Sequence, residues 1–352
     1  MLKLPFFIIA SVLFLSNINN AFSFYLTGQE GCTSVDLRTH FPLKMRNQGD
    51  ISWCYAHAAA DYLQFYNKIP VQISAADIAV NYNKRRWPRL LKWLRGGVVP
   101  ETGFIRSAIF DISSIGYCSE DYFPSETWTK RIMTGDHAGE TVQVPLEKAV
   151  QEIFNLVHHV EAGFYLIPSD LPFVYEFKGL SHQAFYDAVF TNPTGSVLDE
   201  LRSAACDSHR LPFPKDITGM VMNFKGKNAF SQINDVLNQH SAVTVDFFYG
   251  FLENIDQYKT TIGELHTTLL MGRRFNSNSN ECQYLIKNSY GTDCTSYDHR
   301  HQCEDGYVWV SEASLYRAMT SFVYISGSED HFSGTAQQIQ DEQDFQSSSI
   351  VR

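Results

Sequence analysis

The chain has 352 residues, enough for one large domain or two domains of ordinary size. Hydrophobic residues make up 44% of it, including 26 Phe and 18 Tyr, so there is ample apolar surface for a core. The formal net charge is -10, which excludes a general affinity for nucleic acid because phosphate binding needs a basic surface.

The first residues have the pattern of an export signal. A lysine precedes an apolar run of about ten residues (6–15), and small residues follow at Ala21 and Ser23. The run is shorter than the roughly 20 apolar residues that span a bilayer. We therefore predict a signal peptide at 1–23, with an uncleaved anchor as the alternative. The mature chain is expected to be secreted or periplasmic, with no stable membrane anchor after leader removal.

The cysteine count fits an exported protein with one special thiol. Seven cysteines are present, and an odd number in an oxidising compartment predicts a reactive thiol beside paired partners. The other six allow fifteen pairings, of which we single out Cys294 with Cys303 because it would close a short polar loop. A zinc site is the rival explanation, but no Cys-x-x-Cys pair exists. We expect no metal and no cofactor.

The first predicted helix covers 53–67. A turn rich in Asn, Gly and Asp precedes it at 47–50, and Ser52 or Asp50 can cap it. Alanine is frequent in this segment, and small or apolar residues lie nearly all round it. This pattern indicates a helix that is buried on most sides.

Helical patterns come first along the chain and strand patterns second. Beyond the first helix, helical spacing is found at 73–82, 102–115, 146–160, 181–189 and 196–206. Runs rich in β-formers, separated by Gly and Asn, follow at 242–248, 268–271, 283–286, 307–310 and 321–325. This order predicts an α+β fold with two lobes.

The same order predicts a division into segments. After the leader we expect a short N-terminal link at 24–34, a helical lobe at 35–138, a helical insertion at 139–226, a β-rich lobe at 227–326 and a disordered tail at 327–352, rich in Ser, Gln and Asp. A basic run with tryptophans at 83–95 is interpreted as a solvated face, the alternative being contact with a membrane surface or an acidic partner.

Four residues have the character of a nucleophile site. Cys54 stands in the first turn of the predicted helix, where unpaired N–H groups and the helix dipole favour a thiolate. A buried structural cysteine is the alternative. Gln48 lies six residues earlier, and its amide with the Cys54 N–H would make a two-donor oxyanion hole. His266 leads into a strand and Asn288 follows another, which gives the order of a Cys-His-Asn arrangement.

These residues lie in motifs that resemble the papain family of cysteine peptidases, and most of all its bacterial members. The segments that carry the resemblance are Val35-Asp36-Leu37-Arg38 at the start of the domain, Asn47-Gln48-Gly49 with Cys54, His266 before an apolar strand, Lys287-Asn288-Ser289-Tyr290-Gly291-Thr292, the stretch 116–124, and Gly306-Tyr307. The match covers about 35–124 and 232–325, roughly half of the chain.

The resemblance implies a fold and a set of roles. The fold would be papain-like and two-lobed, with a helical left lobe, an antiparallel β-barrel-like right lobe and the active site in the cleft between them. Cys54 would be the nucleophile and His266 the general base, while Asn288 would hold the histidine and Gln48 the oxyanion. Substrate-binding residues are also implied: Gly96 and Gly97 resemble the glycines that pair with substrate backbone, and Val243 and Thr267 resemble lining residues of the second subsite.

Some positions depart from the family pattern. Ile51 replaces the cysteine three residues before the nucleophile. Trp53 replaces a small residue and is expected to narrow the first subsite, and Tyr290 replaces a shielding tryptophan and is expected to leave the histidine–asparagine hydrogen bond wetter. More than two hundred residues separate the cysteine from the histidine, against roughly 130–150 in the family, and the insertion accounts for the excess. We expect the insertion to cover or shape the cleft, or to decorate the surface.

The sequence therefore predicts a secreted papain-like cysteine peptidase that hydrolyses peptide bonds of peptide or protein substrates and acts as a monomer. The alternatives are a catalytically silent papain-fold binding module, and an exopeptidase or peptide ligase that uses the same site. His57, on the nucleophile's helix, is interpreted as a packing or hydrogen-bonding residue. His158 and His159 are not expected to share a metal, because adjacent helical residues face different directions.

Overall fold

The computed structural model describes residues 29–49, 51–86, 103–131, 141–145, 148, 197–215, 217, 219–256 and 265–326. The predicted leader, the helix expected at 146–160 apart from residue 148, the helix expected at 181–189 and the expected tail lie outside the described residues. So does most of the basic run at 83–95.

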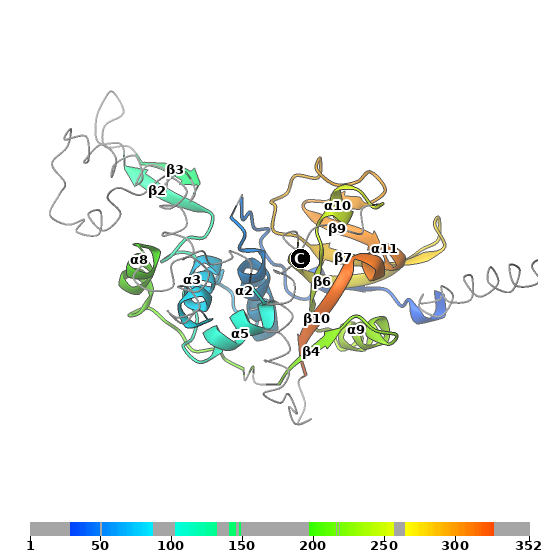
Figure 1. The fold of residues 1–352 in the computed structure, drawn as a ribbon, viewed down its shortest axis with the longest axis horizontal. Coiled ribbons are helices and arrows are strands. Elements are labelled where there is room, and N and C mark those ends of the chain that lie inside the picture. Colours follow the sequence, from blue (N-terminus) through cyan, green and yellow to red (C-terminus); the bar gives the residue numbers. More distant parts are fainter. Residues whose placement is uncertain are drawn as a thin grey trace, which may run out of the picture.

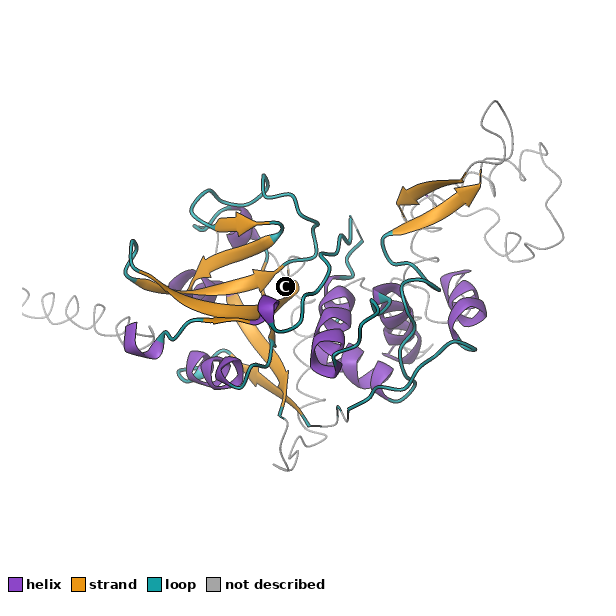
Figure 2. Cartoon of the chain, turned by 180° about the vertical axis from the view of Figure 1, so that it is seen from behind, coloured by secondary structure: helices purple, strands orange, loops and turns teal. Residues whose placement is uncertain are grey.

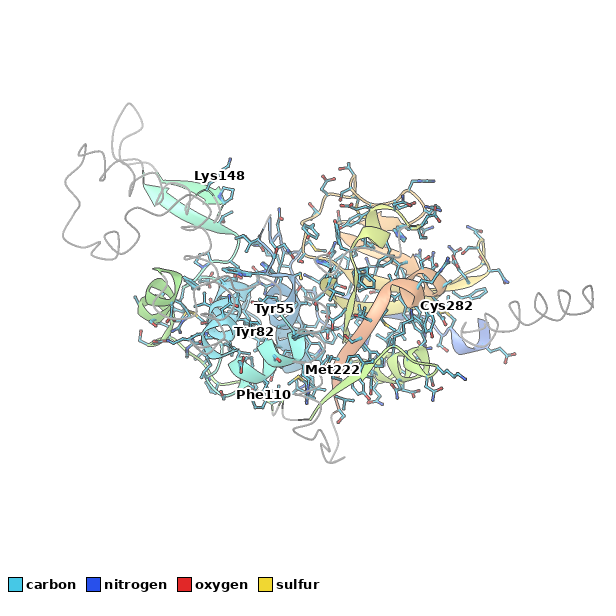
Figure 3. The ribbon with its side chains drawn as sticks, in the orientation of Figure 1. Tyr55, Tyr82, Phe110, Lys148, Met222 and Cys282 are labelled. Atoms are coloured by element: carbon cyan, nitrogen blue, oxygen red, sulfur yellow. A yellow bond between two sulfur atoms is a disulfide. The ribbon has the colours of Figure 1, made fainter. Side chains whose placement is uncertain are left out.

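Helices from the first part of the chain pack together on one side of the molecule (Figures 1 and 2). They are α2 (Cys54–Asn67), α3 (Ala75–Arg86), α5 (Ile105–Ser113) and α8 (Val197–Cys206). Aromatic side chains fill the space between α2 and α3, where the rings of Tyr55 and Tyr82 lie 4.9 Å apart (Figure 3). Nearly every residue of α2 is buried, as its alanine-rich sequence predicts.

Strands from the second part form one antiparallel sheet. Its order is β4 (Met220–Phe224), β10 (Met319–Ile325), β5 (Val243–Phe248), β6 (Leu265–Asn276), β7 (Glu281–Lys287), β9 (Tyr307–Ser311) and β8 (Gln302–Glu304). The short β1 (Val35–Asp36) also pairs with β6, where Gly272 allows the close approach: a Cβ there would lie 2.7 Å from the Val35 carbonyl oxygen. Among the described strands this path is open, not closed into a barrel.

Short helices and a hairpin complete the described fold. The helices α9 (Ala229–Asn238), α10 (Gly250–Glu253) and α11 (Glu312–Ala318) belong to the sheet half, and β2 (Thr127–Arg131) pairs with β3 (Thr141–Pro145) as a separate two-stranded ribbon. Single 3₁₀ turns lie at Gln29–Gly31 and Leu37–Thr39. The α+β plan with two lobes is thus confirmed.

The buried helix α2 lies where the two halves meet and contacts β5 and β6 (Figure 1). This contact brings the start of α2, near residue 54, to strands that come about two hundred residues later. The fold therefore joins the two parts of the sequence that carry the expected site.

Two disulfides join segments that are distant in sequence, Cys32–Cys282 and Cys118–Cys206, and a third, Cys294–Cys303, closes a short loop. The predicted pairing of Cys294 with Cys303 is confirmed. Cys54 is left as the free thiol, in agreement with the odd cysteine count.

Local details differ from the sequence expectations. No side chain caps α2, because Trp53 occupies the N-cap position and makes no capping hydrogen bond there. Residues 220–224, inside the segment expected to be a helical insertion, form an edge strand that pairs with β10. Among the described residues, no helix combines the length and apolarity that crossing a membrane requires.

Candidate active site

Cys54 is the first residue of α2, and its side chain is buried between that helix and the sheet. Beside it runs β6, whose Thr267 backbone N–H lies close enough to the Cys54 thiol to favour its ionised form. His266 precedes Thr267 on the same strand. The free thiol and the predicted base therefore come from adjoining elements of the two lobes.

His266 is held by Asn288, which lies just beyond the end of β7. The histidine Nε2 and the asparagine Oδ1 are 2.7 Å apart, and both residues are buried. The same Oδ1 accepts a hydrogen bond from the Ser289 N–H at 2.9 Å, while the Asn288 Nδ2 donates to the Tyr297 hydroxyl at 2.9 Å. Sequence reasoning missed Tyr297, since it lies in a loop with no motif of its own.

Aromatic rings enclose the imidazole of His266. Tyr290 stacks on it with ring centroids 5.3 Å apart, and Tyr249 and Phe247 approach edge-on at 5.1 and 5.6 Å. The expectation that Tyr290 leaves the histidine–asparagine bond wetter is wrong, because Asn288 is completely buried. Three rings and the Tyr297 hydroxyl take the place of a single large shield.

Gln48 is anchored to the sheet half from the loop before α2. Its backbone N–H donates to the Ser289 carbonyl oxygen at 2.8 Å, and its side-chain Oε1 accepts from the Ser289 hydroxyl at 2.6 Å. The Nε2 donates to the Ile51 carbonyl oxygen at 2.8 Å. A primary amide carries two N–H donors, so the Gln48 side chain has a second N–H beside the one that binds Ile51.

Burial dominates the electrostatics of the thiol and the imidazole. It raises the pKa of the Cys54 thiol to about 11, although N–H groups of Thr267, Tyr55 and Cys54 itself favour the thiolate. Burial likewise lowers the pKa of His266 to about 4, against the effect of its bond to Asn288. The expected lowering of the thiol pKa by the helix terminus is thus outweighed, and at neutral pH the thiol and the imidazole are both uncharged.

A buried charge network lies behind the site. Arg46 binds Asp61 of α2 at 2.7 Å and Glu120 at 2.9 Å, and Asp61 also pairs with Lys287, the last residue of β7. Lys287 and Arg46 are completely buried. The network joins α2 to the strand that ends immediately before Asn288. No spacing rule predicts it, because its members are far apart in sequence.

The structure describes two of the four predicted substrate-binding residues. Gly96 and Gly97 lie outside the described residues. Thr267 lies beside the thiol on β6, and its place in a second subsite stays a prediction. Val243 is fully buried and pairs with Leu270 on β6, so it is not the residue beside Thr267.

The other two helix residues that the sequence singles out both point into the protein. Trp53 is completely buried in the core. The expectation that it narrows the first subsite is therefore wrong, because a substrate side chain would have to meet an exposed residue. His57, one turn beyond Cys54, is also buried, and its Nδ1 has no hydrogen-bond partner in the described part of the chain. Within the described ranges, no three His, Cys, Asp or Glu side chains gather so as to hold a metal ion.

No protein-family profile and no curated protein sequence matches the chain. Among solved structures, it is similar to xylellain, a cysteine protease from Xylella fastidiosa, with 18% identity and a TM-score of 0.41 over 84% of this chain and 86% of that one. It is similar to the bromelain protease of Ananas comosus, with 14% identity and a TM-score of 0.43 over 83% of this chain and 98% of that one. It is also similar to digestive procathepsin L 3 of Tenebrio molitor, with 14% identity and a TM-score of 0.42 over 82% of this chain and 68% of that one. The likeness is to their overall fold.

Proposed function

We propose that the protein is an exported cysteine peptidase of the papain type, in which Cys54 attacks the carbonyl carbon of a peptide bond. The observation that carries the proposal is the position of the free thiol beside β6, the strand whose His266 is hydrogen-bonded to Asn288. A nucleophile, a base and a group that orients the base are the parts that acyl transfer by a thiol requires.

The proposed reaction has two stages. As the substrate enters, the Cys54 proton moves to His266 and the sulfur bonds to the carbonyl carbon, while the Gln48 Nε2 and the Cys54 N–H stabilise the oxyanion. His266 then gives its proton to the leaving amine, and the C–N bond breaks. In the second stage His266 takes a proton from water, whose oxygen bonds to the acyl carbon as the C–S bond breaks. The new carboxylic acid is released, and the proton on His266 passes to the Cys54 sulfur, which restores the thiol and the neutral imidazole.

The uncharged thiol and imidazole fit this proton movement. A thiol whose pKa is about 11 needs a base at the moment of attack, and an imidazole whose pKa is about 4 is unprotonated at neutral pH and can accept the proton. Three disulfides support an oxidising compartment for the protein.

The test is covalent labelling with an epoxysuccinyl thiol probe at pH 7, followed by mass mapping of the labelled peptide. The proposal predicts labelling of Cys54 in the native protein, loss of labelling after Cys54→Ala, and cleavage of a peptide library by the native protein alone. A native protein that takes up no probe and cleaves nothing is a binding module with a silent site. A Cys54→Ala variant that digests substrate as fast as the native chain would falsify the proposal.

A further inference from the structure

Asp246 is a buried acidic residue on the strand next to β6, the strand that runs beside the Cys54 thiol. It lies on β5 directly opposite Thr267 of β6, and the Thr267 hydroxyl donates to its Oδ1 at 2.6 Å. The backbone N–H of the same threonine lies close to the Cys54 thiol. Thr267 therefore connects the Asp246 carboxyl group to Cys54, and a negative charge on that carboxyl group raises the pKa of the thiol.

This carboxyl group has no cation beside it in the described part of the chain. Only 8% of Asp246 is exposed, and besides Thr267 its one other side-chain partner there is the Ser321 hydroxyl, at 2.6 Å from Oδ2. Other buried aspartates are paired: Asp61 with Arg46 at 2.7 Å, Asp77 with Arg210 at 2.6 Å and Asp298 with Arg300 at 2.6 Å. A buried carboxylate is costly unless it meets a positive charge.

The position of Asp246 in its strand is also unusual. The strand reads Val-Thr-Val-Asp-Phe-Phe, and aspartate is depleted in strands because its short polar side chain suits neither the pleat nor the core. Its neighbours Val245 and Phe247 are completely buried. A residue that breaks the local pattern without gaining a charged partner is expected at a functional site.

A carboxylate also retains acceptor capacity here. It can accept about four hydrogen bonds, and two hydroxyl groups use two of these positions. Burial raises the pKa of Asp246, while an approaching cation favours the ionised form. A lysine or arginine side chain of a bound peptide would supply both the missing charge and the missing donors.

We propose that Asp246 is a specificity-determining residue, which selects peptide substrates that carry a lysine or arginine side chain next to the bond that Cys54 attacks. This inference rests on the proposed peptidase function. It names the cationic peptide as the substrate class, and it assigns the choice to Asp246 with Thr267 and Ser321 as the residues that hold its carboxyl group.

The experiment compares fluorogenic peptides that are identical except for arginine or leucine at each position flanking the cleaved bond. At one position the native enzyme should prefer arginine by at least about tenfold in kcat/KM, because a charge-assisted hydrogen bond is worth about 1.5–3 kcal/mol. The Asp246→Asn variant, nearly equal in shape, should lose that preference while it still cleaves the leucine peptide. Asp235→Asn removes the same charge from the exposed face of α9 and should keep the preference.

The outcomes separate this inference from the proposed function. If the native enzyme takes up the thiol probe and cleaves peptides but shows no preference for arginine or lysine at any position, the role of Asp246 is disproved. The same holds if Asp246→Asn keeps the native preference. If neither labelling nor cleavage occurs, the peptidase function itself is wrong. The measurement on the native enzyme decides the question even where the variant does not fold.

Discussion

The Nε2 of His266 lies 2.7 Å from the Oδ1 of Asn288, and the partners of that asparagine determine which histidine nitrogen carries the proton. The Asn288 Nδ2 donates to the Tyr297 hydroxyl, and its Oδ1 accepts from the Ser289 N–H. The atom that faces His266 is thus an acceptor, so Nε2 must donate to it. In the neutral imidazole this leaves the lone pair on Nδ1, the nitrogen that would accept the thiol proton in the reaction proposed above.

Replacing Asn288 by alanine should therefore lower kcat by about a hundredfold, because the imidazole loses its fixed tautomer and its orientation. The measurement is steady-state hydrolysis of the best library peptide. Tyr297→Phe is the matched control: it removes only the hydroxyl that orients Asn288, so its loss should be clearly smaller. Equal activity of Asn288→Ala and the native enzyme would contradict the role of the pair.

The second prediction concerns the amide of Gln48. Its Oε1 is bound by Ser289, so the amide direction is fixed and an N–H can face the oxyanion. Gln48→Ala should lower kcat by about 10²–10³ with a much smaller change in KM, because the donor acts mainly in the transition state. Ser289→Ala leaves the donor in place and only loosens it, so it should cost less. A reversed order of the two variants would refute this assignment.

The Cys-His-Asn-Gln set could be proposed from the sequence because motif residues and their order survive in a single chain. The helix at 53–67 and the central strands were also predictable, since their apolar periods are local. The contacts between neighbouring strands were not predictable, because they depend on the register in which the strands pair. The pairing of Asp246 with Thr267, which determines what lies beside the thiol, depends on how β5 aligns with β6.

Burial was the second property that the sequence could not supply. The first-turn position of Cys54 favours a thiolate in a solvated site, but tertiary packing removes the water and reverses the direction of the pKa shift. The same packing turns Trp53 inward, away from the subsite expected for it. In both cases a local rule was outweighed by how the two lobes pack.

The raised pKa of Cys54 leads to a third prediction, on alkylation of the resting enzyme by iodoacetamide. Below a pKa of about 11 the thiolate fraction grows tenfold for each pH unit, so the rate should still be rising between pH 7 and 9. Denatured protein should instead level off above its ordinary thiol pKa of about 8.5. The Cys54→Ala variant gives the background. A native rate that is already constant below pH 7 would show a stable thiolate and contradict the uncharged resting thiol.

His57 should weaken the protein in acid. Burial lowers its pKa to about 3, and it faces Arg46, Asp61, Lys287 and His266. Between that value and the unfolded value of about 6.5 the unfolded chain binds a proton that the folded chain does not, so stability falls as the pH falls. In His57→Phe, the free energy of unfolding lost between pH 7 and 4.5 should be smaller by about 2 kcal/mol.

Urea denaturation at several pH values measures this difference. His299→Phe is the matched control, because it makes the same change at a side chain that is 91% exposed. Changes in packing can raise or lower the free energy of unfolding of His57→Phe at every pH. Only the loss of a buried imidazole reduces the fall in that free energy between pH 7 and 4.5. An unchanged fall would mean that His57 titrates normally.

Asp61 should be the most sensitive member of the buried network. It compensates two fully buried cations, Arg46 and Lys287, so Asp61→Asn leaves positive charge without a full partner in the interior. Removing one member of a buried pair costs about 3–5 kcal/mol of unfolding free energy, which urea denaturation at pH 7 will measure. Asp256→Asn makes the same change in an exposed pair with Arg300 and should cost far less, because solvent screens that pair. Because Lys287 directly precedes Asn288, similar small losses in the two variants would mean that the network does not brace β7, the strand that ends immediately before Asn288.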